Sequence, residues 1–159
     1  MSAKEYASVA QLKPVSRFVE PTTKSGVTVF ESIGVDDGDL LVVAFRGSAN
    51  LENFATNLRF SLVPLEGHPT AVVHKGFQEA SQGLWGILDE ELKSLQAQGQ
   101  KRTIFTGHSL GGATAQLCAM KAGNGRVQEL VTFGGPLIGE LSFFHAYFSL
   151  FHAYNQPYA

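Results

Sequence analysis

Thr106-Gly107-His108-Ser109-Leu110-Gly111-Gly112 is the stretch of sequence on which the predicted fold depends. Residues 102–106 are mostly apolar or β-branched, which is typical of a buried strand, and the small residues after Ser109 lead into a segment with Leu117 and Met120 on one helical face. The turn between them reads G-x-S-x-G. Glycine is needed two residues to either side of the serine because larger side chains would collide with the strand or the helix. The sequence therefore predicts a strained strand–turn–helix that exposes the Ser109 hydroxyl above the carboxyl end of a sheet.

This turn has the chemistry of a nucleophile. At the start of a helix, the Leu110 amide points toward the same place as the Ser109 hydroxyl, where it can stabilise negative charge. A bare G-x-S-x-G is frequent by chance, so the hypothesis of a serine hydrolase rests on the strand and helix around it. The alternative is a glycine-rich strand–helix turn with a buried serine.

Composition describes an ordinary globular chain. With 159 residues, 44% of them hydrophobic and 16% charged, we expect one domain over residues 1–159. The net charge of −2 and the lack of basic runs argue against nucleic acid as a partner. No apolar signal segment and no stretch of membrane-spanning length stand out, and Cys118, the only cysteine, is interpreted as a buried structural thiol. Together these features predict a cytoplasmic location.

Strands and helices alternate along the rest of the chain. Strands over 27–35 and 39–46, joined through Asp37-Gly38, predict an antiparallel hairpin, and the apolar run 40–45 predicts a central strand buried on both faces. Residues 5–12 predict a short helix stopped by Pro14, and about 77–98 predict a long one. A further strand is expected at 127–133, with parallel pairing around the Ser109 turn. We expect an α/β fold in which a mostly parallel sheet is flanked by helices.

Ester cleavage by a serine also needs a base, a group that orients the base, and donors for the oxyanion. Leu110 N–H is one donor. The second is expected from a loop after an earlier strand, where the sequence has Arg46-Gly47-Ser48. A plain strand-end turn explains these three residues equally well, so from the residues alone both interpretations remain open.

Five segments occur in a fixed order with regular spacing: AFRGS at 44–48, NFATNL at 53–58, VHKGF at 73–77, TGHSLGGA at 106–113 and TFGGPLIG at 132–139. Over roughly residues 27–142 this pattern resembles the class 3 lipase family, the fungal lipase-like branch of the α/β-hydrolases. Several matches in order are far more specific than one G-x-S-x-G.

The resemblance implies a role for each matching residue. Ser109 would be the nucleophile, and Ser48 with Leu110 would form the oxyanion hole. Residues 49–54 correspond to a lid or lid-like helix, and His74 and His108 match structural positions. The implied reaction is hydrolysis of acyl esters such as acylglycerols, with no metal or cofactor, and the implied partner is an acyl ester or lipid substrate with transient contact to a lipid interface.

The C-terminal part departs from the family pattern. The family has an Asp and then a His on further strands, whereas this chain has no Asp after Asp89 and ends in an aromatic tail over 143–159. We therefore expect a chain truncated at its C-terminus, without the last strands of the family fold. Glu140 with His145 or His152 meets the order serine, acid, histidine, but no other pattern supports their geometry. The alternative function is a weak or inactive lipase-like domain that binds lipid or another protein.

Overall fold

The computed structural model describes residues 11–22, 24–32, 39–47, 61–99, 101–123 and 125–150, the last three as helical backbone only. The elements follow the order β1 (Leu12–Val19), β2 (Gly26–Ser32), β3 (Leu40–Arg46), β4 (Leu62–Leu65), β5 (His68–His74), α3 (Lys75–Ala97), β6 (Arg102–His108), α4 (Leu110–Ala122), β7 (Glu129–Phe133) and α5 (Leu141–Leu150). Strands and helices therefore alternate from β5 onward, as an α/β layer fold requires.

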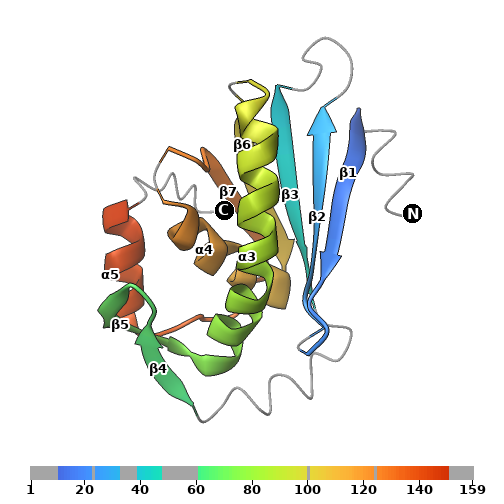
Figure 1. Cartoon of the computed structure of the whole chain (residues 1–159). Coiled ribbons are helices and arrows are strands. Elements are labelled where there is room, and N and C mark those ends of the chain that lie inside the picture. The colour runs from blue at the N-terminus through green and yellow to red at the C-terminus, as the bar shows by residue number, and fades with distance from the viewer. Residues whose placement is uncertain are drawn as a thin grey trace.

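The main sheet is mixed, and its two halves follow from the connections between strands. Its order is β1-β2-β3-β6-β7, and β4 with β5 forms a separate two-stranded ribbon. β1, β2 and β3 are antiparallel neighbours, which confirms the predicted hairpin. β3, β6 and β7 pair in parallel, as expected around Ser109, because helical crossovers connect them. Figure 1 shows α3 lying in front of the sheet, roughly along the strands, and the β4–β5 ribbon with α5 on one side.

β1 is the element that the sequence analysis missed. Leu12 to Val19 form an edge strand. The helix predicted for residues 5–12 is wrong at Gln11, which is a turn residue, and at Leu12, and residues 5–10 lie outside the described part. The pairing of β1 with β2 shifts between Pro14 and Ser16. An edge strand tolerates a proline at such an irregularity because the missing N–H faces no partner strand.

α3 and α4 cover the same face of the sheet. Leucines at positions 84, 88, 92 and 95 of α3 are buried against inward-facing residues such as Val29, Val43 and Phe105. β3 is central, as predicted, but only one of its faces is fully buried: Leu41 and Val43 are inaccessible, while residues 40, 42 and 44 are partly exposed. Among the described residues no helix packs on that second face.

A second apolar cluster holds the ribbon and α5 to α4. It joins Val73 and Phe77 to Leu110, Ile138 and Phe143. Through this cluster the elements on both sides of the Ser109 turn are packed against one core. None of the helices in the described part of the chain is long and apolar enough to cross a membrane.

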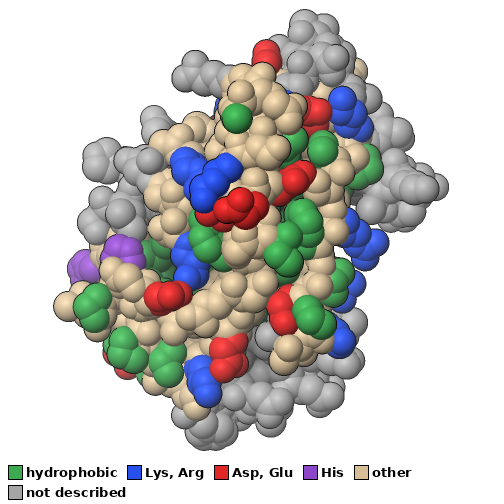
Figure 2. Space-filling model, in the orientation of Figure 1, with side chains coloured by type: hydrophobic (Ala, Val, Ile, Leu, Met, Phe, Trp, Pro, Cys, Tyr) green, Lys and Arg blue, Asp and Glu red, His purple; other side chains and the backbone are tan. Residues whose placement is uncertain are grey.

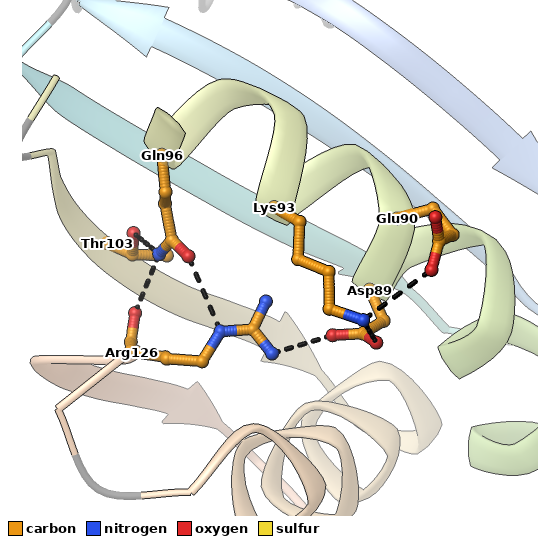
Figure 3. Close-up of polar contacts among 6 residues, drawn as sticks. All are labelled: Asp89, Glu90, Lys93, Gln96, Thr103 and Arg126. Carbon is orange, nitrogen blue, oxygen red and sulfur yellow. Dashed lines mark hydrogen bonds and ion pairs between the residues drawn. The ribbon is translucent and has the colours of Figure 1, made fainter. Parts of the chain in front are cut away.

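A polar cluster ties α3 to the loop before β7 (Figure 3). Asp89 accepts from Lys93 at 2.7 Å and from Arg126 Nη1 at 2.6 Å, and Gln96 Nε2 donates to Thr103 and to the Arg126 carbonyl. The Arg126 guanidinium also lies over the Trp85 ring, 5.9 Å from its centroid. Figure 2 shows acidic and basic side chains side by side over α3 on this face.

The Asp89 cluster makes the free energy of unfolding depend on pH. Its bond with Lys93, and then Arg126, lowers the pKa of Asp89, so the interaction is present above the ordinary Asp pKa of about 4 and disappears as the pH falls through the lower folded value. Asp89→Asn is expected to cost about 1 kcal/mol at pH 7 and almost nothing near pH 2. Urea unfolding at both pH values measures this difference.

Glu90→Gln is the matched control for that prediction. The Glu90 side chain is 80% exposed and reaches only Lys93, at 3.5 Å, so its replacement is expected to leave stability unchanged at either pH. An Asp89→Asn effect that stays equally large near pH 2 would contradict the argument.

Candidate active site

Ser109 occupies the bend between β6 and α4. β6 ends at His108 and α4 begins at Leu110, so Ser109 alone makes the turn, with φ 55° and ψ −125°. A non-glycine residue with positive φ in this region is strained, and such strain is concentrated at functional sites. Ser109 N–H donates to the Phe133 carbonyl at 2.9 Å, and the Ser109 carbonyl accepts from Gly112 N–H at 2.9 Å. The Phe133 anchor was missed by the sequence analysis, although Phe133 ends the expected neighbouring strand.

The glycines around Ser109 are required by close backbone packing. A Cβ at Gly107 would lie 2.4 Å from the Gly111 carbonyl carbon, and one at Gly111 would lie 2.2 Å from the Phe45 carbonyl oxygen. Both distances are shorter than any Cβ contact allows. The predicted collision of side chains with strand and helix is therefore confirmed, and it seats the turn against the end of β3.

The end of β3 lies directly beside the turn. A Cβ at Gly47 would be 2.9 Å from the His108 carbonyl oxygen and 3.9 Å from the Ser109 Cβ. Gly47 therefore lies next to the nucleophile, where the end of the strand before an oxyanion loop is expected. Ser48 and the lid segment at 49–54 lie outside the described residues, and their roles remain predictions.

Leu110 begins α4, and its amide is at the positive end of the helix. Ser109 is the N-cap residue, yet its side chain makes no capping hydrogen bond. Serine at this position usually accepts from the helix backbone. The prediction that the turn exposes Ser109 is wrong, because the residue is only 6% exposed where the turn packs against the ends of β3 and β7. The hydroxyl makes no capping bond and lies at the N-terminus of α4, where the helix dipole favours negative charge.

The two histidines assigned structural positions have separate environments. His108 is exposed, and its Nε2 would lie 3.6 Å from a Cβ at Gly134. His74 packs edge-on against Phe77, with ring centroids 5.9 Å apart, and its buried Nδ1 has no hydrogen-bond partner in the described part of the chain. Neither histidine makes a hydrogen bond to Ser109 among the described residues.

The acid and base candidates from the tail do not form a described triad. His145 is exposed on α5, a helix that packs on β5, and the Glu140 N–H donates to the Val72 carbonyl at 3.0 Å. In the described ranges no hydrogen bond connects either residue with Ser109. His152 lies outside them.

Cys118 belongs to the apolar core beneath α3 and α4. Cys118 is fully buried, and burial raises the pKa of its thiol far above the usual range, which agrees with the predicted structural role. No group of three His, Cys, Asp or Glu side chains with metal-binding geometry occurs within the ranges that the structure describes.

The sequence of this chain is similar to those of known lipases. The sequence model of the family "Lipase (class 3)" matches residues 42–156. A secreted mono- and diacylglycerol lipase of Fusarium solani is 31% identical over 120 residues, which are 74% of this chain and 35% of that protein. The lipase of Rhizomucor miehei is 36% identical over 92 residues, covering 54% of this chain and 24% of the lipase.

Solved structures agree on the fold. The triacylglyceride lipase of Rhizomucor miehei superposes with a TM-score of 0.76 at 25% identity, over 88% of this chain and 54% of that one. The nonglycosylated LIP2 lipase of Yarrowia lipolytica gives 0.78 at 23% identity, over 91% and 53%, and shows the fold alone. The chain thus spans about half of each solved lipase and about a third or less of these two curated relatives. The fold is that of the α/β-hydrolases.

Proposed function

Because this chain belongs to the class 3 lipase family, we propose that it hydrolyses carboxylic esters of acyl lipids, such as acylglycerols, through an acyl-enzyme on Ser109. The observation that supports this most directly is the strained Ser109 bend at the N-terminus of α4, with its hydroxyl free of any capping bond. The Fusarium solani relative, a mono- and diacylglycerol lipase by name, supports the substrate class.

The proposed reaction has two steps. Ser109 Oγ attacks the ester carbonyl carbon, a base takes the hydroxyl proton, and the alcohol leaves with a proton while the acyl group stays on Ser109. Water then attacks the acyl-enzyme and releases the acid. The Leu110 N–H, together with a donor from Ser48, would stabilise the oxyanion in each step.

The second candidate function is lipid or protein binding without turnover. It is favoured by one observation: no imidazole is hydrogen-bonded to Ser109 among the described residues. Loss of the base of a serine triad can lower turnover on the order of 10⁶-fold, so a site without a base binds esters but barely cleaves them.

Labelling with a fluorophosphonate tests the proposal. The reagent phosphonylates an activated serine, and mass spectrometry of the digested protein is expected to locate the label on Ser109. Turnover of p-nitrophenyl butyrate, measured in parallel, separates the two candidate functions. Label on Ser109 together with turnover supports the esterase, whereas the absence of both excludes the esterase and supports the binding module.

The tail histidines are tested separately in an active preparation. His145→Ala or His152→Ala is expected to abolish turnover only if that residue is the base. Normal activity in both variants places the base elsewhere.

Three exposed apolar side chains, one at the end of β7 and two beyond it, support transient contact with a lipid interface. Phe133, Leu137 and Leu141 are 53%, 67% and 71% exposed. Burial of a leucine side chain in lipid is worth about 1.5–3 kcal/mol. Leu137→Asp is therefore expected to reduce co-sedimentation with phosphatidylcholine vesicles at least tenfold, whereas Ile87→Asp, on the outer side of α3, leaves it unchanged. Equal losses in both variants would contradict a localised contact.

A further inference from the structure

A groove of about 460 Å³ lies over β1, β2 and β3. The side chains at its centre alternate with those that face α3 and α4: Val27 and Val29 are buried under the helices, so Thr28 and Phe30 face the other way. The groove is therefore on the opposite face of the sheet from the helices. Its volume is in the range of sites for small ligands.

The floor of the groove follows from strand register. Gly26 lies between Val19 of β1 and Arg46 of β3, so a position without a side chain separates the Val19 and Arg46 side chains. In the next row Thr28 lies between Arg17 and Ala44, both of which also line the groove. Gly26 and Thr28 of β2 and Ala44 of β3 have small side chains or none, so the surface is lower there than at the larger residues on either side.

One end of the groove is apolar. Phe30 is paired with Pro14 on β1, and both line the groove. Adjacent strands are about 4.8 Å apart, so a groove that spans three strands is about 10 Å wide. The Phe30 and Pro14 side chains give this end a surface that suits an alkyl chain.

The other end is cationic. Arg17 and Arg46 are the charged residues among the described lining residues, and no described carboxylate lines the groove. Arg17 donates no hydrogen bond to a described residue. Arg46 Nη2 donates to the Lys24 carbonyl at 3.3 Å in an exposed setting. Two guanidinium groups above a polar threonine therefore lack a neutralising partner in the described part of the chain, which favours an anion.

We propose that this groove binds a single-chain fatty-acid anion, with its carboxylate at Arg17 and Arg46 and its alkyl chain along Thr28, Ala44 and Phe30. The choice of a carboxylate rests on the proposed ester hydrolysis, which releases such an acid. The binding itself does not require turnover, because the groove spans β1 to β3 whereas Ser109 follows β6 on the other side of β3.

Calorimetric titration with decanoate tests the proposal, and the Ser109→Ala variant separates it from catalysis. Saturable binding is expected with the same affinity in both proteins. Butyrate lacks most of the chain and is expected to bind more than a hundredfold more weakly, since each buried methylene contributes about 0.8 kcal/mol. Decanol lacks the charge and is expected to bind at least tenfold more weakly than decanoate.

Variants locate the site. Arg17→Gln is expected to weaken decanoate binding about ten- to a hundredfold, because it removes a charged hydrogen-bond donor. Arg17→Lys keeps the charge and recovers part of that loss. Thr28→Phe fills the groove and is expected to abolish binding. Lys75→Gln removes the same charge from an exposed side chain at the start of α3 and is expected to have no effect.

Thermal melting confirms that each variant is folded before titration. Loss of decanoate binding in Arg17→Gln and Thr28→Phe, with hydrolysis and Ser109 labelling retained, supports the groove. Absence of decanoate binding in the folded wild-type chain, equal affinity for decanol, or unchanged affinity in both groove variants overturns it. A chain that binds decanoate here but never labels at Ser109 refutes the proposed hydrolysis and leaves the groove intact.

Discussion

Replacing Ser109 with glycine is expected to raise the melting temperature of the protein and to abolish its reaction with a fluorophosphonate. Ser109 holds φ 55° and ψ −125°, a conformation that costs a residue with a Cβ about 1 kcal/mol or more and glycine very little. Its backbone bonds to Phe133 and Gly112 do not involve the side chain, so glycine can keep them. A gain of about 1 kcal/mol corresponds to roughly 2–4 °C in a domain of this size.

Two further variants separate strain from chemistry. Ser109→Ala lacks the hydroxyl but keeps the strain, so it is expected to lose labelling and to melt close to the wild type. Ser81→Ala removes another buried serine hydroxyl, which donates to the Gln78 carbonyl at 2.8 Å, and is expected to keep labelling while it loses about 1 kcal/mol. In a chain with a working base, loss of the nucleophile lowers turnover on the order of 10⁶-fold. Labelling of Ser109→Gly at the wild-type rate would show that another residue reacts.

Gly111→Ala is expected to have the largest effect on stability. The new Cβ would lie 2.2 Å from the Phe45 carbonyl oxygen and 2.9 Å from the Arg46 carbonyl carbon, and both are backbone atoms of β3. β3 cannot yield without disturbing its parallel pairing with β6, and α4 cannot yield without leaving the sheet. We expect a loss of about 4 kcal/mol or more in urea unfolding, together with loss of labelling, because the turn is displaced.

Gly86→Ala is the matched control for Gly111→Ala. Gly86 is an exposed residue within α3, and no heavy atom lies within 4 Å of its hypothetical Cβ. Alanine there is expected to stabilise the protein by about 0.5–1 kcal/mol through helix propensity. A Gly111→Ala protein as stable as the wild type would mean that β3 and the turn are not packed as the structure shows.

The parts of the fold that the sequence predicted are those with strong local signals. The Ser109 turn was found because its glycines and its neighbouring strand and helix are close in sequence. The hairpin between β2 and β3 was found from Asp37-Gly38 and the apolar runs around it. The α/β-hydrolase fold and the class 3 lipase family followed from motifs that lie far apart but keep their order, and both are confirmed.

Features set by long-range packing were harder to predict. β1 includes Pro14 and exposed residues such as Val15 and Val19, so its sequence has no clean alternation, and only pairing with β2 makes it a strand. The outer face of β3 is partly exposed although the run 40–45 is entirely apolar, because the helices lie on one side. The Phe133 anchor of Ser109 depends on a neighbouring strand more than twenty residues away, which no local pattern records.

The Ser109–Phe133 bond defines how much chain the nucleophile requires. Three neighbouring strands each supply one support: β3 offers the backbone on which Gly111 rests, β6 leads into the bend, and β7 carries the carbonyl that holds the Ser109 amide. A piece that ended before Phe133 would keep the whole G-x-S-x-G and still leave that amide without its acceptor. The shortest segment that can form this site therefore runs from β3 to Phe133 and includes these three strands. It is much longer than the G-x-S-x-G motif by which the site is recognised.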